Sequence, residues 1–205
     1  MSENDMTDDR YKTLEYPAEG LYKEKGSRFI AHALPAGSLG EVRQHLETLK
    51  RKYHDARHHC YAYRLGEPPY QYRYNDDGEP SGTAGKPIYG QLQSFELTNL
   101  VMVVIRYFGG IKLGTGGLIQ AYRAAARDAI TNGNIIIKHW TAILQISMDY
   151  SRMSEVMRLI KENDARIMKQ EYLPDPTIAL KISKGKKEEM IQKLKLIEKV
   201  EVIVI

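Results

Sequence analysis

The chain has 205 residues, of which 42% are hydrophobic and 27% charged, and its net charge is +4. Such a composition can fill a packed core and favours a soluble protein, and the length allows one or two domains. The longest apolar run, which contains Val101 to Ile105, is far too short to span a bilayer. Residues 1–10 lack the basic start and apolar stretch of a signal peptide, so we expect a short disordered leader there.

Cys60 is the only cysteine, which excludes an internal disulfide and favours a reducing compartment, the cytoplasm. A pI near 8.9 is compatible with a polyanionic partner. The basic residues do not gather into an arm, however, and nucleic-acid-binding proteins usually concentrate their charge. Net charge therefore does not identify a partner.

The first part of the chain mixes strand and helix patterns. We expect a hairpin of strands 20–25 and 28–34 that turns at Gly26-Ser27, followed by a helix of 39–49 capped by Ser38. Strands at 59–65 and 70–74 come next, and then a helical stretch at 89–95. A strand at 100–107 leads into a helix capped by Thr115. The continuous apolar run of 100–107 is typical of a strand buried on both faces. Residues 131–138, which contain Asn-Gly-Asn, are expected to be a hinge.

The last third reads strand, helix, strand, strand, helix, strand. The strands are expected at 143–150, 166–173, 177–183 and 200–205, with one helix capped by Ser151, another lined by Met190, Ile191 and Leu194, and a turn at Pro174-Asp175-Pro176. This is the ferredoxin-like order, in which both helices cover one face of a four-stranded sheet. The fold class is thus α+β, with domains at 11–135 and 140–205.

Glycine clustering is the strongest functional signal, because nine of the 16 glycines lie between Gly78 and Gly117. Glycine carries an entropic cost unless the backbone must bend sharply or approach something closely. Two loops hold most of them, 75–86 and 106–117. We predict that these loops lie side by side and form one groove at the end of the 100–107 strand, where binding sites are often built. In that groove Lys86, Arg106 and Lys112 would face Asp76, Asp77 and Glu79.

The 106–117 loop leaves a strand and enters a helix. Free backbone N–H groups at such a helix start would suit a phosphate or carboxylate. The candidate ligand-binding residues here are Arg106, Gly109, Gly110, Lys112, Thr115 and Gly116. Known nucleotide motifs do not fit, because Gly85-Lys86 precedes Pro87 and the dinucleotide pattern would need glycine at Ile119. The alternative is that these glycines serve only tight turns and close packing.

The 75–86 loop brings carboxylates and hydroxyls together. Its candidate residues are Asp76, Asp77, Glu79, Ser81, Thr83 and Lys86. Clustered oxygens could hold Mg²⁺, or a carboxylate pair could act as general acid and base. The alternative is a polar turn in which the Asp side chains bind their own backbone.

A group of histidines precedes Cys60. His58 and His59 are adjacent and would point to opposite faces of a strand, and no second cluster completes a zinc shell, so we expect no metal and no cofactor. A free cysteine is more often a small buried hydrophobe than a nucleophile, and we interpret Cys60 in that way.

Fourteen tyrosines accompany only three phenylalanines. Tyr61 and Tyr63 share one strand face, and Tyr70, Tyr72 and Tyr74 share a face of the next strand. Such an aromatic face beside basic residues could stack single-stranded bases. The alternative is that the rings form the inner face of the sheet against the helices.

Three strings carry a resemblance to a known family: HHCYAYRLG at 58–66, NDDGEPSGTAGKPI at 75–88 and VIRYFGGIKLGTGGLIQAYR at 104–123. They closely resemble the signature of the IMPACT family and its bacterial, YigZ-like members, over residues 11–131. The resemblance implies a first domain similar to domain IV of elongation factor G and a second similar to its domain V.

The family also implies a role touching translation, since eukaryotic IMPACT proteins dampen the amino-acid-starvation kinase response by occupying that kinase's activator. Those proteins use an additional N-terminal domain, so this interaction is not carried over, and the family offers no catalytic residues to transfer. Our leading hypothesis is a non-enzymatic protein that contacts RNA or a ribosome-associated factor. An enzyme acting on a small anionic substrate and a pure protein-interaction module are the alternatives, and the oligomeric state is left open.

Overall fold

A computed structural model describes residues 9–172 and 175–205. The chain is a mixed α/β protein with antiparallel sheets, and it divides into two compact units. The first is Tyr11–Lys138, and the second is His139–Ile205 with residues 9 and 10. Most of the expected leader, and the start of the expected turn at Pro174, lie outside the described residues.

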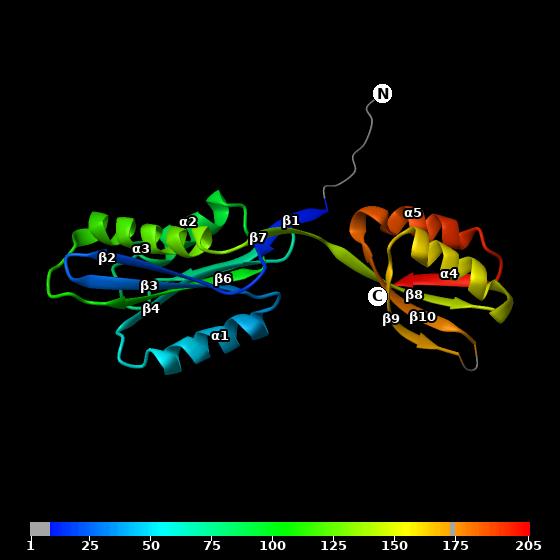
Figure 1. Cartoon of the computed structure of the whole chain (residues 1–205), viewed down its shortest axis with the longest axis horizontal. Coiled ribbons are helices and arrows are strands. Elements are labelled where there is room, and N and C mark those ends of the chain that lie inside the picture. Colours follow the sequence, from blue (N-terminus) through cyan, green and yellow to red (C-terminus); the bar gives the residue numbers. More distant parts are fainter. Residues whose placement is uncertain (1–8, 173–174) are drawn as a thin grey trace, which may run out of the picture. The chain divides into compact units, whose positions relative to one another are not determined.

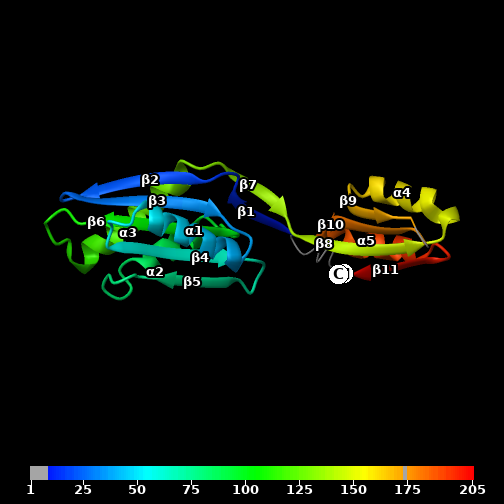
Figure 2. The same ribbon diagram turned by 90° about the horizontal axis from the view of Figure 1, so that it is seen from below.

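The first unit is built on a five-stranded sheet in the order β2-β3-β6-β4-β5, in which all neighbours are antiparallel (Figure 2). The strands are β2 (Ala18–Glu24), β3 (Ser27–Pro35), β4 (His58–Leu65), β5 (Gln71–Asn75) and β6 (Leu100–Tyr107). Helix α1 (Leu39–Lys52) covers one face, and α2 (Gly85–Ser94) with α3 (Gly114–Thr131) covers the other (Figure 1). Side chains of β6 enter both cores, so the prediction that this strand is buried on both faces is confirmed.

The ends of these elements test the predictions made from single residues. The Ser38 hydroxyl accepts a hydrogen bond of 3.2 Å from the Glu41 N–H, which confirms Ser38 as the cap of α1. Thr115 does not cap α3, because the helix begins at Gly114 and no side chain accepts from its first turn. The hairpin turns at Lys25-Gly26, one residue earlier than predicted, because both residues adopt the positive φ that a two-residue hairpin turn requires.

Two strands were missed altogether. Strand β1 (Arg10–Leu14) pairs with β7 (Ile135–His139), so the segment predicted as a hinge contributes a strand. Next to the pair, the Glu15 N–H donates to the Asn134 carbonyl at 2.9 Å. The Asn-Gly-Asn sequence favoured a loop, while the partner that makes 135–139 a strand lies at the other end of the first unit.

The second unit follows the predicted order of elements. They are β8 (Thr141–Met148), α4 (Met153–Glu162), β9 (Arg166–Glu171), β10 (Thr177–Ser183), α5 (Lys184–Lys195) and β11 (Val200–Val204). The sheet has the antiparallel order β11-β8-β10-β9, and both helices lie on one of its faces (Figure 1). Ser151 does not cap α4. It lies in a short 3₁₀ turn, Tyr150–Arg152, and donates its N–H to the Asp149 carboxylate at 2.9 Å.

No helix in the described ranges is long and apolar enough to cross a bilayer.

Asp9 ties the N-terminal segment to the start of α5. Its carboxylate accepts hydrogen bonds from the Ser183 hydroxyl and, at 3.0 Å, from the Gly185 N–H, and it pairs with His139 at 2.8 Å. Burial raises the pKa of Asp9, but these hydrogen bonds outweigh burial and lower it from 3.8 to about 2. The ionised carboxylate also suits the positive end of the helix dipole.

A carboxyl group with a lowered folded pKa stabilises the fold above its unfolded pKa, and this contribution is lost as pH falls through the folded value. We therefore expect Asp9→Ala to lower the urea midpoint of the second unit at neutral pH. The difference from wild type should close as pH falls from about 4 to about 2. Fluorescence of Trp140, the single tryptophan, reports this unit. A difference that stays constant across this pH range would contradict the assignment.

Candidate functional site

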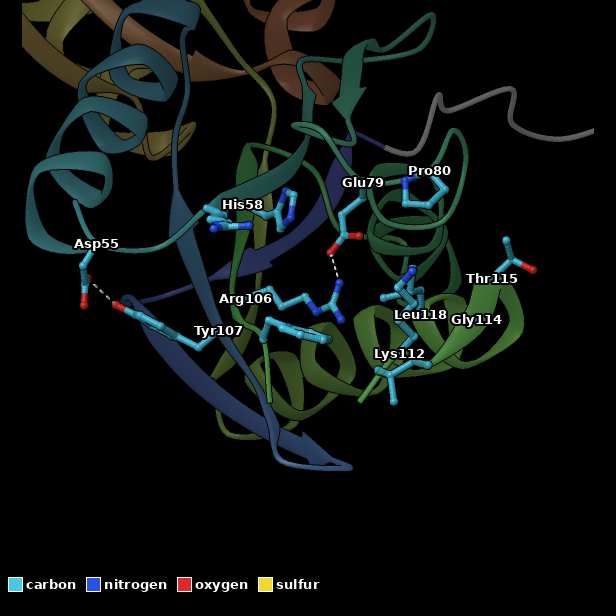
Figure 3. A pocket seen from close by; sticks show the side chains of 13 residues that line it. Asp55, His58, Glu79, Pro80, Arg106, Tyr107, Lys112, Gly114, Thr115 and Leu118 are labelled. Carbon is cyan, nitrogen blue, oxygen red and sulfur yellow. Dashed lines mark hydrogen bonds and ion pairs between the residues drawn. The ribbon is translucent and has the colours of Figure 1, made fainter. Parts of the chain in front are cut away.

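An open cavity of about 850 Å³ lies at the end of β6 (Figure 3). Because β4 runs antiparallel to β6 with His58 opposite Arg106, the start of β4 and the end of β6 meet at one edge of the sheet. The lining comes from three segments: 55–58 before and at the start of β4, 79–80, and 106–118 at the end of β6 and the start of α3.

The two glycine-rich loops meet at a buried ion pair. Arg106 Nη1 lies 2.6 Å from Glu79 Oε1, and both side chains are more than nine-tenths buried. Figure 3 shows the pair at the wall of the cavity, with Glu79 pointing toward the guanidinium. The expectation that the 75–86 and 106–117 loops lie side by side is therefore confirmed, whereas a ligand-binding role for the cavity is a proposal.

A network of buried polar groups in the protein interior holds the Glu79 carboxylate in place. The Tyr122 hydroxyl donates to Glu79 Oε1 at 2.8 Å, and the Cys60 thiol lies 3.4 Å from that hydroxyl and donates to the Asp76 carbonyl at 2.9 Å. Burial raises the pKa of Tyr122 and of Cys60 far above their usual values, so both remain protonated. Cys60 is completely buried and takes the structural role predicted for it.

The other two carboxylates of the 75–86 loop bind the backbone. Asp76 accepts hydrogen bonds of 2.8 to 3.0 Å from three N–H groups within 82–85, at the start of α2. Asp77 accepts one of 2.7 Å from the His59 N–H. The contacts of Asp76 are those of the polar-turn alternative, whereas Asp77 ties the loop to the backbone of β4. In the part of the chain that the structure describes, no group of three His, Cys, Asp or Glu side chains is placed to hold a metal ion.

The structure separates the predicted site residues into two sets. Glu79, Arg106, Lys112 and Thr115 line the cavity. Asp76, Asp77, Ser81, Thr83, Lys86, Gly109, Gly110 and Gly116 do not. The expectation that three cations face three carboxylates is met by one pair only, since among the described residues neither Lys86 nor Lys112 forms an ion pair with those carboxylates.

Four polar residues that line the cavity were not predicted, namely Tyr107 at the end of β6 and a group before and at the start of β4: Asp55, Arg57 and His58. This group comes from the connection between α1 and β4, and only the β4–β6 register places it beside Arg106. The sequence presents His58 as a possible metal ligand or as a neighbour of Cys60, not as part of a cavity. Its Nδ1 lies 2.8 Å from the Asp77 carbonyl, and because a carbonyl only accepts, Nδ1 carries the proton.

The glycines do not bring the two loops together. A Cβ on Gly109 would lie 1.9 Å from the carbonyl carbon of Gly26, so Gly109 packs against the β2–β3 turn instead of the 75–86 loop. Gly85 packs in the same way against the Asn75 backbone. Gly110 and Gly114 have positive φ and open surroundings, which makes them turn residues.

Cations outnumber anions in the lining of the cavity, where Arg57, Arg106 and Lys112 accompany Asp55 and Glu79. Arg57 and Lys112 are exposed and form no ion pair within the described residues. Asp55 accepts a hydrogen bond of 2.7 Å from the Tyr107 hydroxyl, and this bond lowers the pKa of Asp55. With Arg106 neutralised by Glu79, the two free cations and the N-terminus of α3 favour an anionic ligand.

Residues 25–130 match a family model described as the Impact N-terminal domain. The chain belongs to the IMPACT family. It is 33% identical over 162 residues to IMPACT family member YvyE of Bacillus subtilis (strain 168), a match that covers 79% of this chain and 75% of that protein. It is also 33% identical over 158 residues to YigZ of Escherichia coli (strain K12), covering 76% and 78%. The predicted YigZ-like membership of the IMPACT family is therefore confirmed.

The fold is shared with a solved structure described as the crystal structure of an hypothetical protein. The two have a TM-score of 0.74 and 28% sequence identity, and the match covers 96% of this chain and 98% of that one. Both units of this IMPACT family member therefore have counterparts in one known structure.

Proposed function

We propose that this IMPACT family member is a non-enzymatic binding protein linked to translation or its regulation, and that it contacts RNA through the cavity at the end of β6. One observation carries the RNA contact. The mouth of the cavity presents two unpaired cations, Arg57 and Lys112, beside the uncapped N-terminus of α3. Phosphate groups suit such a surface, because both the side-chain charge and the free N–H groups attract anions.

A binding role is favoured over catalysis because the carboxylates are already engaged. Asp76 and Asp77 accept hydrogen bonds from backbone N–H groups, and Glu79 is paired with Arg106. A general base or a metal ligand needs free lone pairs directed at the substrate. In this proposal the three carboxylates hold the two loops in place, and this structural role accounts for the cluster of polar residues.

The link to translation rests on family membership and on the resemblance of the two domains to domains IV and V of elongation factor G. The second unit supports a ferredoxin-like assignment, since its strand order β11-β8-β10-β9, with two helices on one face, is the order expected of that arrangement. The contact would be with ribosomal RNA or with RNA bound by a ribosome-associated factor.

Reversing both free charges should weaken RNA binding. In a filter-binding titration against structured RNA and ribosomes, we expect Arg57→Glu with Lys112→Glu to lower affinity by about tenfold or more. The slope of log K against log salt should fall by about two, one unit for each lost phosphate contact. Arg43→Glu with Lys50→Glu is the matched control, because it changes the net charge by the same amount and both residues are exposed on α1 and do not line the cavity.

Two outcomes would count against the proposal. Absence of association with RNA and ribosomes at both low and moderate salt would remove the function itself. An equal loss in the Arg43→Glu, Lys50→Glu variant would keep RNA binding but remove the cavity as its site, because net charge alone would then explain the effect.

A further inference from the structure

A second surface of the first unit gathers four tyrosines, which we call the tyrosine patch: Tyr70, Tyr72, Tyr74 and Tyr89. Tyr72 and Tyr74 belong to β5, which is an edge strand of the sheet, and Tyr89 belongs to α2. None of the four lines the cavity at the end of β6. The patch is therefore separate from the site already described.

The rings of the tyrosine patch are stacked and open. Tyr72 and Tyr89 lie with ring centroids 4.8 Å apart and an angle of 19° between their planes, and Tyr74 lies 5.9 Å from Tyr89. Tyr72 is 54% exposed and Tyr74 is 41% exposed. By contrast, Tyr63 points to the other face of the sheet and packs in the α1 core. The sheet thus presents a short column of rings with uncovered surface.

Two cations flank this column. The Arg64 guanidinium lies 3.5 Å from the centre of the Tyr70 ring. Lys86 lies three residues before Tyr89 on α2, which places both on one helix face, and within the described residues it forms no ion pair. Arg64 also donates to the Leu97 carbonyl, so Lys86 is the cation left to meet a ligand, and stacked rings beside it complement a polymer that carries both flat bases and phosphates.

We propose that the tyrosine patch binds the bases of single-stranded RNA, with Lys86 beside a phosphate. Every base has a π-face that can stack on an exposed ring, so the contact would tolerate many sequences. A duplex hides those faces within its own stack, and its bases would not reach the patch. That the polymer is RNA rests on the proposed function, whereas the residues involved are different from those of the cavity.

The test compares double variants of the patch in fluorescence anisotropy titrations. The probes are a short labelled oligouridylate and an RNA duplex of the same length. Tyr72→Ala with Tyr74→Ala should weaken oligouridylate binding by about tenfold, since each stacked base contributes substantially, and should leave duplex binding unchanged. Tyr72→Phe with Tyr74→Phe keeps the rings and should bind as wild type does.

Tyr16→Ala is the matched control, because Tyr16 is 67% exposed and lies outside the patch. If the alanine double variant binds oligouridylate as the Tyr16→Ala variant does, the patch is overturned while the cavity proposal stands. If the patch variants weaken oligouridylate binding but the Arg57 and Lys112 variants weaken binding of neither the oligouridylate nor the duplex, the cavity fails and the patch stands. If the wild-type protein binds neither the oligouridylate nor the duplex, both the cavity and the tyrosine patch are overturned as RNA sites.

A second copy of the chain is the competing occupant, because β5 is an edge strand whose backbone could pair with another edge. Light scattering separates the two. A mass that rises with concentration in wild type, and that stays at the monomer value in the alanine double variant, would overturn the RNA assignment. A monomer at all concentrations in both proteins, with circular dichroism spectra that agree, supports it.

Discussion

Replacing Glu79 by alanine should cost about 3 to 5 kcal/mol of unfolding free energy, because it leaves Arg106 buried without its partner. The Arg106 guanidinium lies 2.6 Å from the Glu79 carboxylate, and the Arg106 Nε is already buried without a hydrogen-bond partner. Removing the carboxylate also takes away the acceptor of the Tyr122 hydroxyl. Urea denaturation followed by circular dichroism measures the change.

A double variant separates loss of the pair from loss of packing. Glu79→Leu with Arg106→Met removes both charges and keeps apolar volume, so it should be much closer to wild type than Glu79→Ala. Glu96→Ala is the exposed control, since Glu96 pairs with Lys12 at 2.5 Å on the surface and should matter little. If Glu79→Ala changes the free energy of unfolding as little as Glu96→Ala does, the buried pair does not stabilise the fold, and other contacts hold the two loops together.

The sequence predicted the helices and strands that are determined by residues within the element or next to it. The apolar run of β6 (Leu100–Tyr107) indicated burial on both faces, and the serine at position 38 indicated the start of α1. Strands β1 and β7 were missed, because each becomes a strand only through its pairing with the other, more than a hundred residues away. The Thr115 cap was wrong because Gly114, with positive φ, lets the chain enter α3 without a side-chain acceptor.

The candidate site was predicted in part for the same reason. Arg106 and Glu79 lie in the two loops that glycine clustering marked, and these loops do meet. Arg57 and His58 were missed as site residues, because only the β4–β6 register brings the start of β4 to the end of β6. Clustering of glycines indicated close backbone contact but not its partner, which for Gly109 is the β2–β3 turn.

The contact of Gly109 with the β2–β3 turn predicts a second large change in the free energy of unfolding, caused by one added methyl group. A Cβ at position 109 would lie 1.9 Å from the carbonyl carbon of Gly26 and 2.1 Å from the nitrogen of Ser27. Both are backbone atoms held in the β2–β3 hairpin, so neither can move aside as a flexible side chain would. We expect Gly109→Ala to lower the unfolding free energy by about 3 kcal/mol, at the upper end of the usual range for overpacking.

Gly116→Ala is the matched control, because it adds the same methyl group to the same glycine-rich segment. Apart from its chain neighbours and the backbone of its own helix, no atom lies within 4 Å of a Cβ at position 116, so alanine in α3 should leave stability unchanged or raise it by up to about 1 kcal/mol. Urea midpoints of the two variants therefore test whether 106–117 is rich in glycine for one reason or for several. Equal midpoints would mean that the β2–β3 turn yields to Gly109→Ala. Opposite shifts would show that Gly109 holds the segment against the hairpin, while Gly116 makes no close packing contact that requires glycine.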